Sequence, residues 1–148
     1  MKATLTQIIH RRMTDHYPEK LLEMQLSGEY TSYLQRMSEM IWGNWYLATE
    51  GQDISVGLEL VRETLLHLFG ASAFDYVETL LCTHFSVWHK ALVDGGIARY
   101  EIMNILHLSV PLWSQFPIDA DSEPHPELTN QLLELIRSYR IPSYQLTI

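Results

Sequence analysis

Histidines are the residues of this chain whose type and number most suggest chemistry, since 7 of the 148 residues are histidines. A metal site on one helix needs two ligands three or four residues apart, because only that spacing places both on one face. His84 and His89 are five residues apart, and His10 and His16 are six apart. Neither pair therefore predicts a metal site within one helix.

A metal ion could still be bound by histidines from separate helices. His67, His84 and His107, together with a carboxylate, are the candidate ligands for such a site. We favour ordinary structural or surface roles for these residues. His84 falls on an apolar helical face and is expected to be a hydrogen-bonded core histidine. No cofactor is predicted.

Other patterns that could support catalysis are incomplete. Asp119, Asp121 and Glu123 alternate as at the start of a calcium-binding loop, but Pro124 stands where that loop requires glycine. The better interpretation is a solvated acidic loop. Cys82 lacks the cationic neighbours that activate a thiol. The chain also has no phosphate-binding glycine loop and no dinucleotide fingerprint, so we favour a non-enzymatic role.

The densest aromatic group consists of Trp42, Trp45 and Tyr46. Aromatic platforms that stack on single-stranded nucleic acid are accompanied by lysine and arginine, whereas only Arg36 is close to this group. The net charge of −8, with no basic cluster, also argues against binding to a phosphate backbone. We expect these rings to fill the core or an interface with a protein partner or a second copy.

The apolar residues repeat at helical spacing most regularly between Ile54 and Trp88. Gly70 stands where the first of two helices should end, and Ser72 and Asp75 have the spacing of a capping box that begins the second. Two apolar faces joined by so short a turn are expected to pack together as a central αα-hairpin. The two faces consist of Ile54, Leu58, Val61, Leu65 and Leu68, and of Phe74, Val77, Leu81, His84 and Trp88.

Helical periodicity covers most of the remaining chain as well, and nothing in it indicates a parallel sheet. Gly43 lies inside the longest expected helix and predicts that another helix approaches closely there. We predict one all-α domain over residues 1–148, built as a compact bundle of about five to six helices around the hairpin, with a docked or frayed tail after Pro142. The other expected helices cover residues 4–16, 19–25, 29–49, 97–113 and 127–139.

The composition supports a folded domain, because 47% of the residues are hydrophobic. No apolar run approaches the about 20 residues that a membrane helix requires. The first 13 residues lack the continuous apolar block of a signal peptide. The single cysteine, Cys82, cannot form an internal disulfide. Together these features predict a cytoplasmic protein that does not use a membrane as a partner.

Three stretches are similar to a family of small helical proteins of unknown function from Bacteroidetes, often encoded near mobile or conjugative elements. The segment 15–19 resembles the family's His-Pro-Glu after its first helix, 56–85 resembles its central region, and 106–141 resembles its Phe-Pro acidic loop and last helix. The chain departs from the family at Gly70-Ala71-Ser72-Ala73, where His-Phe-Ser is usual. The resemblance implies an all-helical bacterial protein and carries over no functional residue.

These observations favour a non-enzymatic helical module for protein–protein interaction or self-association, with Trp42, Trp45 and Tyr46 as the candidate contact residues. The alternative is a small-molecule or metal-binding protein with a histidine-lined pocket between helices.

Overall fold

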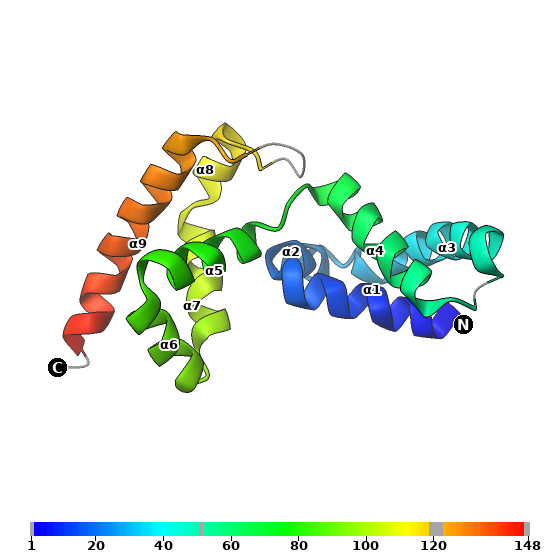
Figure 1. The fold of residues 1–148 in the computed structure, drawn as a ribbon, viewed down its shortest axis with the longest axis horizontal. Coiled ribbons are helices and arrows are strands. Elements are labelled where there is room, and N and C mark those ends of the chain that lie inside the picture. Colours follow the sequence, from blue (N-terminus) through cyan, green and yellow to red (C-terminus); the bar gives the residue numbers. More distant parts are fainter. Residues whose placement is uncertain (1, 51, 119–122, 147–148) are drawn as a thin grey trace. The chain divides into compact units, whose positions relative to one another are not determined.

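The computed structural model describes residues 2–50, 52–118 and 123–146, and these are helical or connect helices, with no strand among them (Figure 1). The all-α prediction is confirmed. The described residues form nine helices rather than five to six, namely α1 (Lys2–His16), α2 (Pro18–Ser27), α3 (Tyr30–Thr49), α4 (Ile54–Phe69), α5 (Ala73–His84), α6 (Ser86–Asp94), α7 (Ala98–Leu108), α8 (Val110–Gln115) and α9 (Pro126–Leu146).

Two of the expected helices are each divided by one residue with a non-helical backbone. Phe85, at φ −136° and ψ 46°, separates α5 from α6. Ser109, at φ −101° and ψ 9°, separates α7 from α8, and Pro111 lies in the first turn of α8, where a proline costs no hydrogen bond. Apolar periodicity continues through both breaks, so it did not reveal them.

The contacts divide the chain into two compact units, Met1–Gly70 and Ala71–Ile148, and each is described here by itself. The prediction of one domain concerns whether the whole chain folds as one cooperative unit, and it stays a prediction.

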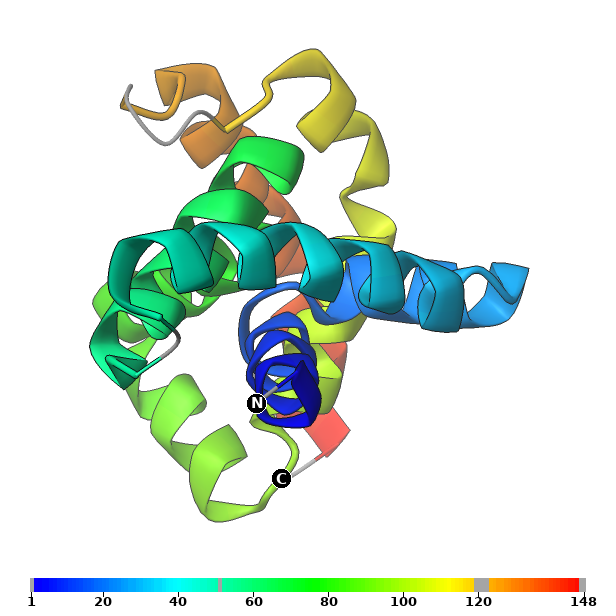
Figure 2. The same ribbon diagram turned by 90° about the vertical axis from the view of Figure 1, so that its right-hand side faces the viewer.

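The first unit is built from α1, α3 and α4, with α2 packed against α1 and α3. Figure 2 shows α3 crossing α1, which is seen nearly end-on. Tyr17 leaves the helical region before Pro18, as expected, and its hydroxyl donates a hydrogen bond of 2.9 Å to the Gly70 carbonyl. The buried core residues of this unit are Leu5, Ile9, Met13, Tyr17, Leu21, Met37, Ile41, Trp45, Val61 and Leu65.

Of the two helical glycines in this unit, Gly57 of α4, and not Gly43, is closely approached by another helix. A Cβ atom built on Gly57 would lie 2.9 Å from the indole ring of Trp45, whereas one built on Gly43 meets nothing within 4 Å. Within the single chain, the prediction for Gly43 is therefore wrong. A glycine inside a helix indicates close approach of another helix of the same chain only when it faces the core, and Gly43 is on the exposed side of α3.

Alanine substitutions at these two glycines are expected to have opposite effects on stability. Gly43→Ala should raise the free energy of unfolding by about 0.5–1 kcal/mol, because alanine has the higher helix propensity and its methyl group meets no neighbour. Gly57→Ala should lower it by about 1 kcal/mol or more, because overpacking against Trp45 outweighs the same helical gain. Urea unfolding of dilute protein measures both. A stabilising Gly57→Ala would contradict the packing described for Trp45.

The buried face of α4 is rotated relative to the predicted one. Val61 and Leu65 are fully buried with Gly57, but the other members of the predicted face, Ile54, Leu58 and Leu68, remain about half exposed at 49%, 50% and 46%. Apolar residues surround much of this helix, so their spacing left more than one face possible, and packing against α1 and α3 selected one.

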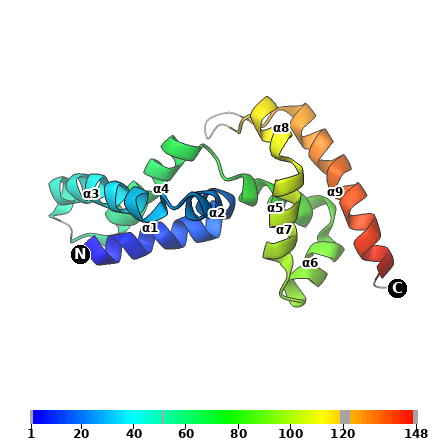
Figure 3. The ribbon, with the colours of Figure 1, turned by 180° about the vertical axis from the view of Figure 1, so that it is seen from behind.

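The second unit has its own core, formed chiefly by α5, α7 and α9. Helix α8 continues the chain from the end of α7 (Figure 3). At the start of α5, the Ser72 hydroxyl accepts a hydrogen bond of 3.0 Å from the Asp75 N–H, as the capping box predicts. The buried residues are Phe74, Val77, Leu80, Leu81, Phe85, Ile102, Ile105, Leu106, Leu128, Leu132 and Ile136.

The apolar faces of α4 and α5 are buried in two separate cores and not in the predicted central hairpin. The face of α4 belongs to the core of the first unit, and the face of α5 belongs to the core of the second. Gly70 ends α4 at positive φ as predicted, but its ψ of −163° makes the following connection extended rather than a tight turn. Helix spacing and capping therefore identified both helices correctly but not their packing partners.

The last helix is longer than expected from the sequence. Helix α9 passes through Pro142 and continues to Leu146, and a docked or frayed tail after Pro142 stays a prediction. Residues 147 and 148 lie outside the described part of the chain. Among the helices described, none combines the length and apolar character needed to cross a membrane.

Candidate functional site

The three aromatic candidates on α3 occupy very different environments. Trp45 is fully buried, Trp42 is partly buried, and Tyr46 is 54% exposed. The rings of Trp42 and Trp45 meet edge to face with centroids 5.7 Å apart, and Trp42 and Tyr46 are 6.1 Å apart. The group is continuous from core to surface, so only its outer part can contact another molecule directly.

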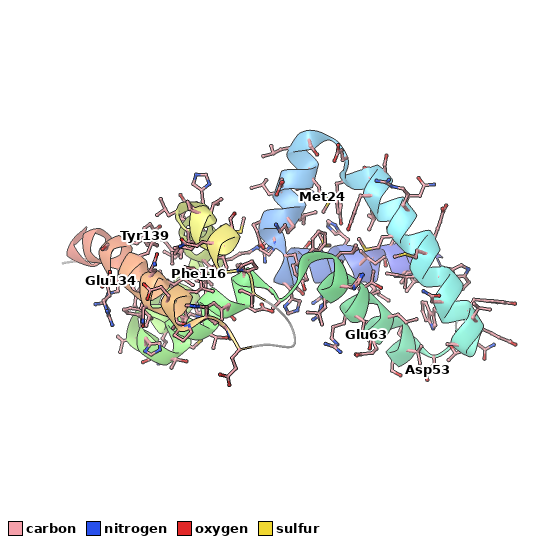
Figure 4. All side chains as sticks on the ribbon, turned by 90° about the horizontal axis from the view of Figure 1, so that it is seen from above. Met24, Asp53, Glu63, Phe116, Glu134 and Tyr139 are labelled. Atoms are coloured by element: carbon pink, nitrogen blue, oxygen red, sulfur yellow. The ribbon has the colours of Figure 1, made fainter. Side chains whose placement is uncertain are left out.

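Trp45 is held in place by the junction between α3 and α4. Its indole Nε1 donates a hydrogen bond of 2.9 Å to the Asp53 carbonyl, which also accepts the Gly57 N–H at 3.3 Å. The Asp53 side chain, labelled in Figure 4, caps α4 by accepting from the Ser55 N–H and hydroxyl. This capping, chiefly through the Ser55 hydroxyl, lowers the pKa of the Asp53 carboxyl. Trp45 is therefore a structural residue.

The candidate metal ligands are separate surface residues. His67, His84 and His107 lie on α4, α5 and α7 and are all exposed. The interpretation of His84 as a core residue is wrong, because Val77 and Leu81 fill the core-facing side of α5. Among the residues that the structure describes, no three His, Cys, Asp or Glu side chains are grouped so that they could hold a metal ion. The acidic positions Asp119 and Asp121 lie outside the described residues.

A contact between Cys82 and His89 was not anticipated from the sequence. The break at Phe85 brings the Cys82 sulfur to 3.4 Å from Nδ1 and 3.7 Å from Nε2 of His89. Since these two distances are nearly equal, the sulfur lies over the ring or its edge and not in line with either nitrogen. A general base must align with the proton it removes, so this arrangement does not favour a Cys–His nucleophile.

Tyrosine hydroxyls connect helices within each unit. In the first unit, the Tyr30 hydroxyl is 2.7 Å from Nδ1 of His10, and burial raises the pKa of Tyr30 to about 12. In the second unit, the Tyr139 hydroxyl donates to the Glu101 carboxylate and accepts a hydrogen bond of 3.1 Å from the Asn104 amide. Tyr139, labelled on α9 in Figure 4, is thereby tied to α7.

Tyr139 should make the second unit sensitive to alkaline pH. Burial, and secondly the hydrogen bond to Glu101, raise its pKa from 10.0 to about 12. The protonated Tyr139 side chain therefore makes its full contribution to the free energy of unfolding below about pH 10, and this contribution is lost as the pH rises towards 12. In Tyr139→Phe, urea unfolding midpoints should be lower at neutral pH but should fall less between pH 10 and 12 than in the wild type. Tyr46→Phe, at a 54% exposed tyrosine of the first unit, is the control and in dilute protein should keep the alkaline slope of the wild type. An unchanged alkaline slope in Tyr139→Phe would contradict this assignment.

The outer face of α3 is the surface with the clearest capacity for binding. Leu47 is 84% exposed, and Met40 and Tyr46 are 52% and 54% exposed. The buried residues Ile41 and Trp45 lie on the opposite side of the same helix. We call the exposed set the α3 outer face; its members are Arg36, Glu39, Met40, Gly43, Tyr46 and Leu47 of α3, together with Glu50, which directly follows the helix at a positive φ of 56°, and all of them are exposed.

Sequence reasoning identified only Tyr46 of this face. The signal that could have revealed the rest is the presence of apolar residues on two opposite sides of one helix, since Met40 and Leu47 repeat at a helical spacing separate from that of Ile41 and Trp45. A helix that covers one core needs only one such stripe.

The chain matches no protein-family model, no curated protein and no solved structure. The functional argument therefore rests on the chain's own residues.

Proposed function

We propose that this protein is a non-enzymatic helical module that binds another protein or a second copy of itself. The observation that carries the proposal is the α3 outer face, where Leu47 is 84% exposed beside the half-exposed Met40 and Tyr46. Exposed leucine, methionine and tyrosine side chains gain free energy when a partner removes them from water, and tyrosine and methionine are enriched in protein interfaces.

The aromatic group supports a role for this face in binding. Trp45 anchors the inner side of α3 to the core, and Trp42 connects it to Tyr46. A surface aromatic that rests on a rigid core loses little conformational entropy on binding, which favours affinity. The interface that we propose therefore uses Tyr46 directly, while Trp42 and Trp45 act by supporting it.

The histidines give less support to the alternative function, a protein that binds a small molecule or a metal ion. The three candidate histidines are exposed on different helices, so they do not line an apolar pocket in either unit. We further propose a cytoplasmic location, supported by the single cysteine Cys82. An origin in Bacteroidetes near mobile elements is supported only by the resemblance in three stretches of sequence.

A matched pair of leucine substitutions tests the proposed function. Leu47→Glu places a charge on the α3 outer face, and Leu26→Glu places the same charge on an 80% exposed leucine of α2. We expect the wild type and Leu26→Glu to self-associate in light scattering or to retain the same partner in pull-downs from native lysate, and Leu47→Glu to lose that association. A wild-type protein that stays monomeric and retains no partner would refute the proposal.

A further inference from the structure

We infer that the partner of the α3 outer face is a second copy of this chain, bound as an antiparallel pair of α3 helices related by a twofold axis at Gly43. The inference rests on the proposed binding function and deepens it. Its basis is the arrangement of charge: the cation Arg36 on α3 and the anion Glu50, which directly follows α3 at a positive φ of 56°, are both seven residues from Gly43, one on each side. The Glu50 N–H still donates to the Tyr46 carbonyl, so its backbone lies one turn beyond Tyr46, and an antiparallel pair about Gly43 brings each Arg36 close to the Glu50 of the other copy.

The rest of the face is complementary to itself under the same symmetry. An α-helix rises about 1.5 Å per residue and turns about 100° per residue. Relative to a line drawn through Gly43 along the helix, parallel to its axis, Met40 and Leu47 therefore lie on the same side, three and four residues from Gly43. The twofold axis places each Met40 beside the Leu47 of the other copy. These two side chains are 52% and 84% exposed in the single chain, and the pairing would bury both.

Glu39 and Tyr46 occupy the other side of the line, four and three residues from Gly43. The symmetry brings each Tyr46 hydroxyl to the Glu39 of the other copy, where it can donate a hydrogen bond to the carboxylate. Each end of the interface thus contains three contacts between the copies: one apolar, one hydrogen-bonding and one ionic. Such isologous contacts are typical of twofold dimers.

Gly43 at the axis permits the two helices to approach closely. A Cβ atom at this position would meet nothing within 4 Å in the single chain, so the fold of the unit does not require glycine there. Helices that meet at small residues can pack with their axes about 8 Å apart. The glycine that lacks a role in the core would lie where the two backbones are nearest.

A parallel arrangement does not have these features. It would place Arg36 against Arg36 and Glu50 against Glu50, and like charges at matching positions are unfavourable. The charge pattern therefore selects the antiparallel orientation. The interface consists of one helix per chain, which is smaller than the standard protein interface, so we expect an equilibrium between monomer and dimer that depends on concentration.

Charge reversal tests this orientation. Arg36→Glu and Glu50→Arg should each place like charges at both ends of the dimer, and each should raise the dimer dissociation constant at least about tenfold by sedimentation velocity. The double variant Arg36→Glu/Glu50→Arg should return to within about threefold of the wild type. An equimolar mixture of the two single variants should associate as a heterodimer, because both of its ionic pairs are attractive. Lys20→Glu and Glu23→Arg, charge reversals at exposed residues of α2, are the controls and should behave as the wild type.

The outcomes separate this inference from the proposed function. If the wild type dimerises but the α3 variants match the α2 controls, the α3 pairing is wrong while self-association stands. If the wild type is monomeric at every concentration, the α3 pairing is also wrong, and the proposed function then depends on a different protein that the Leu47→Glu variant fails to retain. Recovery of association in the mixture could not arise from misfolded single variants.

Discussion

Replacing Trp45 by alanine is expected to lower the free energy of unfolding by about 3–5 kcal/mol. The side chain is fully buried, its ring lies against Gly57, and its Nε1 hydrogen bond holds the Asp53 carbonyl at the start of α4. Alanine leaves a cavity at the centre of the first core and breaks the link between α3 and α4. Urea unfolding followed by far-UV circular dichroism measures the loss.

Tyr46→Ala is the control for this substitution. Tyr46 is the next residue of the same helix but is 54% exposed, so its removal from the monomer should change stability by only about 0.5 kcal/mol. Equal losses in the two variants would contradict the separation of this aromatic group into a core residue and a surface residue.

The second large effect is expected from Leu132→Ala in α9, which should lower the free energy of unfolding by about 2–5 kcal/mol. Leu132 is fully buried in the core of the second unit, so alanine leaves a cavity there. Urea unfolding measures the change. Val87→Ala, at an 84% exposed residue of α6, should alter stability by no more than about 0.5 kcal/mol.

Together the two variants also test the prediction of a single domain. If the chain unfolds in one cooperative transition, Trp45→Ala and Leu132→Ala should each move that transition. If Met1–Gly70 and Ala71–Ile148 unfold separately, each variant should move only the transition of its own unit. Amide hydrogen exchange of the two variants would show which residues lose protection in each case.

Local signals predicted many helix boundaries well. Tyr17 leaves the helical region before Pro18, Gly70 takes positive φ after α4, and Ser72 caps α5. Each of these depends on interactions within a few residues of chain, such as the steric restriction before proline or a side-chain oxygen that accepts a nearby N–H. The break at Phe85 had no such local signal and was missed, whereas the break at Ser109 lies two residues before Pro111, a residue type that kinks or ends a helix.

The candidate site was only partly predictable. The cluster at Trp42, Trp45 and Tyr46 was recognised from aromatic density, but whether a ring is core or surface depends on where the neighbouring helices lie. Trp45 is covered because α4 presents Gly57 to it. Histidine spacing was likewise informative only within a helix, so the exposure of His84 could not be inferred from its apolar neighbours.

What the sequence determined by itself is that the chain is helical and where several helices begin and end, because propensity, periodicity and capping act within one or two turns. What only the tertiary structure decided is how those helices are paired. The apolar faces of α4 and α5 entered two different cores rather than one hairpin. The second stripe of α3, with Leu47 on it, stayed exposed while the first was buried. Hydrophobic burial is not directional, so an apolar stripe specifies that a helix needs a partner but not which surface provides it.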